Sequence, residues 1–150
     1  MNPRSLSRRG VLSQLLLLPL LGVATGCGSE DAPEEGFAEQ PLTVVTSDAG
    51  KLRLAVWTSP GQPPDRGVLK LQLEVTDASS DAPVDGLYYD IVPDMPSMGH
   101  GTPTVPKTEA QGGGLYIVSD VNLFMAGRWQ LRITITGSVS DVAIVQIDVR

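Results

Sequence analysis

Strict alternation of hydrophobic and polar residues runs through most of the chain after its first quarter. Two eight-residue stretches, 69–76 and 129–136, alternate without interruption, and stretches 51–57 and 142–149 follow the same period. A period of two places successive side chains on opposite faces, which is typical of a strand with one buried and one solvated face. Trp129 falls on the hydrophobic phase of its stretch, so we expect it in the core.

Shorter strands are predicted at 42–45, 87–92, 115–118 and 121–125, with Pro-, Gly- and Asp-rich turn signals between the strands. No segment after residue 27 keeps a helical period for three turns. Short strands spaced by turns predict an all-β fold, specifically an immunoglobulin-like antiparallel β-sandwich of about seven strands. A small orthogonal barrel is the alternative. The passage 93–114, rich in Pro and Gly, predicts one long loop of the functional or mobile kind.

Residues 1–26 have a different pattern, that of a signal peptide. Three arginines, Arg4, Arg8 and Arg9, precede an apolar run at 11–23 that is too short for a stable transmembrane helix. Residues 7–12 resemble the twin-arginine export motif. Residues 21–27 resemble a bacterial lipobox ending in Cys27, the only cysteine of the chain. The resemblance implies a lipid on Cys27; the alternative is an ordinary thiol beside a cleavage site.

Residues 27–40 are acidic and poor in large apolar side chains, which predicts a flexible linker before a single domain at 41–150. After Cys27 the chain carries eight basic and 17 acidic residues, a net charge of −9. This charge argues against a nucleic-acid partner and against a basic patch for anionic lipids. We therefore expect a protein held to a membrane by lipidated Cys27, at the periplasmic or extracellular face of a bacterial cell envelope.

The most distinctive chemistry lies at 95–100, where Met95, Met98 and His100, the only histidine, fall within six residues. Pro96 and Gly99 indicate a tight bend. Thioether sulfur is a soft donor that selects Cu(I), and neutral imidazole also suits copper. We expect a Cu(I)-binding loop here. Methionine also fills irregular gaps in protein cores, so packing is the alternative reading of Met95 and Met98.

Two more side chains are candidates for the same site. Met125 follows Val121 and Leu123 at a period of two, so it is either a fourth ligand or a core residue. Trp57 falls on the polar phase of its stretch, so we expect a partly exposed residue. An indole at the surface also suits a π cover over Cu(I) or an interface anchor.

Three segments together resemble the YtkA-like domain, which is related to FixH-type proteins and occurs in bacterial envelope lipoproteins. They are Met-Pro-Ser-Met-Gly-His at 95–100, Gly-Leu-Tyr at 114–116 and Phe-Met-Ala-Gly-Arg-Trp-Gln-Leu at 124–131. The similarity covers about 52–149. It implies an immunoglobulin-like sandwich and suggests a link to copper handling or respiratory-oxidase assembly. It places the residues at 95, 98 and 100, and Met125, at the family's methionine and histidine positions.

Catalytic chemistry is not indicated. Carboxylates fall singly at turns and on polar strand faces, no Gly-x-Ser-x-Gly elbow is present, and Gly112–Gly114 does not open a helix. We therefore expect a non-enzymatic protein that buffers Cu(I) or delivers it to an oxidase-assembly protein or an efflux pump. The alternative is an interaction module of an envelope or respiratory-assembly complex, in which the 93–114 loop docks a partner without metal.

Overall fold

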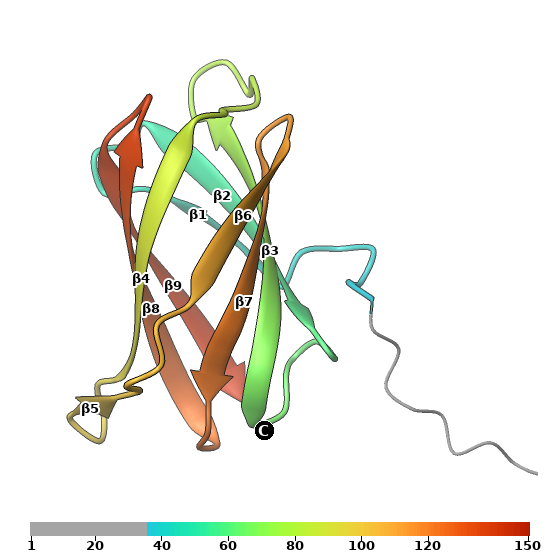
Figure 1. Cartoon of the computed structure of the whole chain (residues 1–150), viewed down its shortest axis with the longest axis vertical. Coiled ribbons are helices and arrows are strands. Elements are labelled where there is room, and N and C mark those ends of the chain that lie inside the picture. The colour runs from blue at the N-terminus through green and yellow to red at the C-terminus, as the bar shows by residue number, and fades with distance from the viewer. Residues whose placement is uncertain (1–35) are drawn as a thin grey trace, which may run out of the picture. The chain divides into compact units, whose positions relative to one another are not determined.

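Residues 36–150 are described by a computed structural model and form two antiparallel sheets packed face to face (Figure 1). The first sheet has the strand order β1 (Thr43–Thr46), β2 (Leu52–Ser59), β3 (Gly67–Asp77), β7 (Leu115–Leu123), β6 (Lys107–Gly112). The second has the order β5 (His100–Gly101), β4 (Leu87–Met95), β8 (Gly127–Gly137), β9 (Asp141–Val149). The described part of the chain contains no helix with the length and hydrophobicity needed to cross a bilayer.

The strand order confirms the predicted sandwich and its immunoglobulin-like class. An immunoglobulin domain pairs strands A-B-E-D in one sheet and C-F-G in the other. Here β2-β3-β7-β6 and β4-β8-β9 take those places, with β1 added beside β2 and β5 beside β4. The described residues therefore hold nine strands, two of them short edge strands, where about seven were expected.

The core lies between the sheets and is built from the alternating residues of the long strands. Inward side chains of β2, β3, β8 and β9 are almost all completely buried, as the period-two patterns predicted. Trp129 is fully buried, as expected. Large buried side chains of this kind stabilise a fold by roughly 2 kcal/mol each relative to their exposed state.

A bulge in β7 explains why this strand reads as two shorter ones in the sequence. Leu71 pairs with Val118 and Leu69 with Val121, so β7 carries one residue more than β3 between these pairs. Asp120 lies in this bulge and has φ 60°, in the left-handed region of backbone conformation. The alternation is thereby shifted by one position, and both valines face the core.

The passage 93–114 is not one long loop, and the prediction was wrong there. β4 runs on to Met95, a two-residue strand β5 follows, and β6 occupies most of the second half of the passage. β6 is an almost wholly exposed edge strand with few apolar residues, so it shows no hydrophobic alternation in the sequence. Pro93 interrupts the hydrophobic pattern of β4. At Pro93, β4 is the edge of its sheet, because β5 pairs only with Asp94 and Met95, and proline is tolerated in an edge strand.

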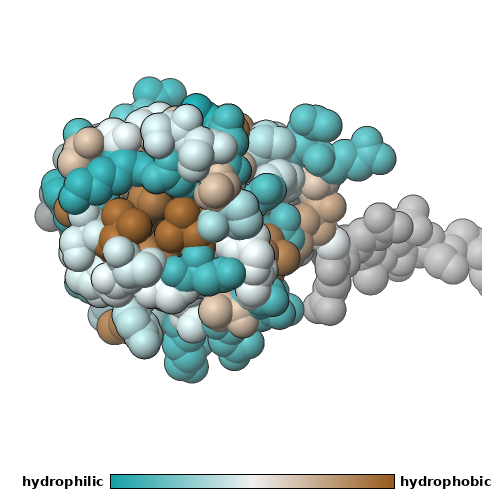
Figure 2. Space-filling model, turned by 90° about the horizontal axis from the view of Figure 1, so that it is seen from above, coloured by the Kyte–Doolittle hydropathy of each residue, from teal (hydrophilic) through white to brown (hydrophobic). Residues whose placement is uncertain are grey.

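The connections fall at two ends of the sandwich. We call the upper end, at the top of Figure 1, the one with the β1–β2, β3–β4, β6–β7 and β8–β9 connections. The lower end carries the β2–β3, β4–β5 and β7–β8 connections and the C-terminus. Figure 2 looks down on the upper end and shows apolar side chains on the floor of a hollow with a polar rim.

Aspartates tie the upper connections together. Asp141 accepts hydrogen bonds from the Ser47 hydroxyl at 2.6 Å and the Ala49 N–H at 3.0 Å, which joins the start of β9 to the β1–β2 turn. Burial opposes ionisation of Asp141, but these hydrogen bonds outweigh it and lower its pKa to about 2. Asp85 similarly accepts N–H bonds from Gly113 and Gly114, at 3.2 and 2.9 Å.

Candidate metal site at the lower end

The β4–β5 connection is a tight hairpin that closes on Met95. Met95 and His100 are directly paired residues of the two strands. The N–H groups of Met98 and Gly99 both donate to the carbonyl oxygen of Met95, at 2.9 and 3.1 Å. Gly99 takes φ 67°, in the left-handed region that glycine adopts without strain. These hydrogen bonds fix the backbone conformation of the loop residues 96–99.

Met95 continues the inward-facing phase of β4 and is only 3% exposed. The expectation that it lies in the loop was wrong, because the strand extends past Pro93 to reach it. Its methyl group lies against the backbone of Gly127, where an added Cβ would stand 2.7 Å from the methyl carbon. Met95 is thus a core residue whose position depends on the absence of a side chain at residue 127.

Met98 and His100 are accessible to solvent, in contrast to Met95. The Met98 side chain is 55% exposed, at the tip of the hairpin. The imidazole of His100 stacks on the ring of Phe124, with centroids 6.0 Å apart and planes inclined by 13°. Phe124 in turn meets the buried Trp129 edge-on, at 5.5 Å and 71°. A ladder of three rings thereby connects the exposed imidazole to the core.

Met125 lies in the β7–β8 connection, directly after Phe124. Its side chain is half-buried and packs against the core, and its carbonyl oxygen accepts a hydrogen bond of 2.8 Å from the Trp129 indole N–H. The backbone of Met125 therefore holds the loop that supports His100. Its side chain has the partial burial of a packing residue.

The lower end brings three of the four candidate donors onto one hairpin. Met95 and His100 face the same side of the sheet, where the Cβ atoms of paired residues lie about 5 Å apart. Met98 lies between them in the loop, and the connection carrying Met125 reaches His100 through Phe124. Two thioethers and one imidazole suit a soft cation such as Cu(I). Within 36–150, no three His, Cys, Asp or Glu side chains are grouped closely enough to hold a metal ion.

Trp57 is not brought to this hairpin. It lies in β2 of the first sheet, in the outward phase that the sequence predicts, and pairs with Gln72. Its side chain is nevertheless 8% exposed, so the expectation of a partly exposed tryptophan was wrong. Gln62 is hydrogen-bonded to the residue that follows Trp57, because its carboxamide oxygen accepts the Thr58 N–H at 3.2 Å. The amide group of Gln62 donates to the carbonyl oxygen of Gln40 at 2.8 Å.

Two residues important to the site had no assigned role in the sequence. Phe124 supports the imidazole, and Gly127 makes room for Met95. Both lie in the Phe-Met-Ala-Gly-Arg-Trp segment, so its resemblance to a family motif was the available signal. The predicted signal peptide, Cys27 and the first part of the 27–40 linker lie outside the described residues.

One comparison with known proteins gives a match. The family model described as YtkA-like matches residues 48–134, which includes both the Met95–His100 hairpin and the β7–β8 connection that supports it. No curated protein and no solved structure gives a significant match. The matched region is more than half of the chain, and the chain therefore belongs to the YtkA-like family.

Proposed function

We propose that this protein binds Cu(I) at the β4–β5 hairpin and buffers the ion or passes it to a partner. A lipid on Cys27 would hold the protein at a membrane of the bacterial envelope, on the extracytoplasmic side. The supporting observation is the pairing of Met95 with His100 across a hairpin whose tip carries the exposed Met98.

The buried and the exposed residues of the hairpin have different roles in the proposed copper binding. Met98 and His100 are exposed, so they are the ligands that an incoming or outgoing ion meets first. Met95 is fixed in the core and offers a sulfur whose position is already determined before binding. Soft donors at an exposed site suit a protein that exchanges copper with a partner and does not enclose it. Met125 remains a candidate fourth ligand.

Competition against a chromophoric Cu(I) chelator under reducing conditions tests the proposal. The wild-type chain should retain one Cu(I), and a Met98→Leu/His100→Gln double variant should lose at least tenfold in affinity. Ser97→Ala in the same loop is the matched control and should bind like the wild type. Equal copper retention by the wild type and the double variant would remove the site.

A second candidate is a metal-free interaction module of an envelope or respiratory-assembly complex. The observation that favours it is the exposure of large apolar side chains in three connections, namely Met98 between β4 and β5, Val105 between β5 and β6, and Phe124 between β7 and β8. Such side chains are common in protein interfaces. If the double variant keeps the wild-type metal content but no longer recovers a partner by affinity purification, this second function is the correct one.

A further inference from the structure

Apolar side chains protrude from the connections at the lower end of the sandwich. Met98 and Phe124, in the β4–β5 and β7–β8 connections, are 55% and 43% exposed. The large hydrophobic residues of the upper connections, Val84 and Val139, are half-buried and pack against the core. The apolar side chains seen from above lie on the floor of the hollow, below its polar rim (Figure 2). The lower end therefore presents apolar tips to a flat surface, and the upper end does not.

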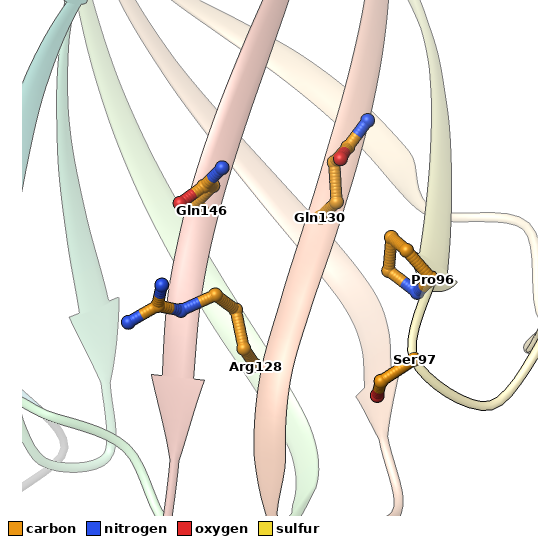
Figure 3. A pocket seen from close by; sticks show the side chains of 5 residues that line it. All are labelled: Pro96, Ser97, Arg128, Gln130 and Gln146. Atoms are coloured by element: carbon orange, nitrogen blue, oxygen red, sulfur yellow. The ribbon is translucent and has the colours of Figure 1, made fainter.

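Polar side chains border the protruding tip of the hairpin. Ser97 precedes Met98 in the loop. Beside the loop, polar residues line the outer face of β8 and β9, namely Arg128, Gln130 and Gln146 (Figure 3). The Arg128 guanidinium donates to both carboxylate oxygens of Asp148, at 2.9 and 3.2 Å, so its charge is compensated. Apolar tips with such polar flanks suit the headgroup region of a bilayer and not its hydrocarbon core.

Charge is distributed unequally between the two ends. The upper connections and the strand residues that flank them carry five aspartates and one lysine, namely Asp48, Asp77, Asp81, Asp85, Asp141 and Lys51. The corresponding residues of the lower end and the C-terminus carry Asp65, Arg66 and Arg150. With His100 neutral, the side-chain charge is −4 at the upper end and +1 at the lower end. The negative surface potential of a membrane with anionic lipids repels the upper end and not the lower end.

The chain that precedes the sandwich reaches it beside a lower connection. The carbonyl oxygen of Gln40 accepts a hydrogen bond of 2.8 Å from the side-chain amide of Gln62, in the β2–β3 connection. Gln40 is thirteen residues after Cys27, a length that spans at most about 45 Å when fully extended. The proposed lipid on Cys27 would therefore keep the domain close to a bilayer, where even a weak contact forms at a high effective concentration.

We propose that the lower end docks on the surface of a phospholipid bilayer, with Met98 and Phe124 among the headgroups and the acidic upper end turned away. This orientation rests on the lipid anchor of the proposed function, but it does not require copper. It places the candidate copper ligands Met98 and His100 at the membrane surface. The exchange partner that fits this orientation is a membrane-embedded protein whose own site opens at the level of the headgroups.

The test is an NMR measurement on the metal-free, ¹⁵N-labelled chain from Cys27 onward, which contains both sheets. Its single thiol is coupled to a maleimide lipid in nanodiscs of phosphatidylcholine and phosphatidylglycerol. A gadolinium-chelating lipid then increases the relaxation of amide protons close to the headgroups. The increase at the backbone N–H groups of Met98 and Phe124 should be at least threefold larger than at Gly50 and Ser138, in the upper connections.

Substitutions of the apolar tips should remove this difference between the ends. A Met98→Ser/Phe124→Ser variant should lose it. Met98→Asp alone, which leaves the stacking of Phe124 on His100 intact, should reduce it at least twofold. Tyr88→Ser is the matched control, because it removes a side chain that is 72% exposed on the outer face of β4, and it should leave the difference unchanged.

Three results would overturn the proposal. They are equal relaxation at both ends, stronger relaxation at the upper end, and an unchanged pattern in the folded double variant. Equal relaxation would instead favour a protein partner for the apolar tips. The measurement contains no copper and supplies the lipid chemically, so its failure and the failure of the proposed copper function are separate results.

Discussion

The two ends of the sandwich are formed by the same strands but are closed by different chemistry. At the upper end, Asp85 and Asp141 accept backbone and hydroxyl hydrogen bonds that join connections far apart in the sequence. At the lower end, aromatic stacking and a glycine contact support a hairpin with exposed Met98 and His100. The upper end is thus joined by hydrogen bonds to carboxylates, whereas the lower end exposes a thioether and an imidazole above a packed aromatic support.

The largest expected effect of a single substitution is at Asp141. Asp141→Ala removes the acceptor of the Ala49 and Val142 N–H groups and leaves the buried Ser47 hydroxyl only the Leu52 carbonyl oxygen, at 3.2 Å, which should lower the free energy of unfolding by about 3 kcal/mol. Urea unfolding followed by fluorescence measures this loss. Asp48→Ala, in the same turn, is the control and should change stability little. Copper binding at the lower end should be unaffected, and a parallel loss of affinity would contradict the separation of the two ends.

Acid should act on the two ends through different groups. The folded-state pKa of Asp141 is about 2, below the ordinary value, so its contribution to stability is fully present above about pH 4 and is lost as the pH falls toward 2. Protons compete with copper for an imidazole ligand, so copper retention should also fall in acid, in a step that does not depend on Asp141. Parallel titrations of unfolding free energy and copper content should therefore separate. Coincident transitions would show that copper loss is only a consequence of unfolding.

Gly127→Ala should be the most disruptive small change at the lower end. Gly127 has φ 125°, and an added Cβ would collide with the Met95 methyl group. We expect a loss of about 2 kcal/mol in unfolding free energy. Displacement of Met95 should also weaken Cu(I) binding. Gly36→Ala, where an added Cβ meets no atom within 4 Å, is the control. A variant of wild-type stability would show that Met95 has room to move.

Two tyrosines packed edge-on give a smaller contrast inside the sandwich. Tyr116 donates to the carbonyl oxygen of Val84 at 2.9 Å, whereas the buried hydroxyl of Tyr89 has no partner among the described residues. Burial raises the pKa of Tyr89 far above its ordinary value. Tyr116→Phe should cost about 1 kcal/mol, and Tyr89→Phe should be neutral or slightly stabilising. Thermal unfolding of both variants decides, and a larger loss at Tyr89 would reveal an unseen partner of its hydroxyl.

The smallest effect on stability is expected at the hairpin tip. Met98 is 55% exposed, so Met98→Leu should change the free energy of unfolding by less than about 0.5 kcal/mol. The same substitution removes the thioether and should reduce Cu(I) affinity. Chelator competition and urea unfolding of one preparation measure both quantities. A substantial loss of stability would identify Met98 as a structural residue.

The sequence by itself determined the sandwich, because alternation with a period of two fixes which face of each long strand is buried. It also identified the 95–100 segment, since methionine and histidine in a Pro/Gly bend are chemically distinctive. It did not reveal β6, whose exposed edge position demands no hydrophobic pattern, nor the full length of β4, which Pro93 conceals.

Only the tertiary structure decided that Met95 is buried and that Met98 is exposed to solvent. Burial of Met95 depends on Gly127, and the support of His100 depends on Phe124, both more than 20 residues away in the sequence. Such contacts arise from the pairing of β4 with β8 and from the path of the β7–β8 connection. Periodicity within a single strand carries no information about either, because it records the direction of a side chain and not the neighbour that it meets.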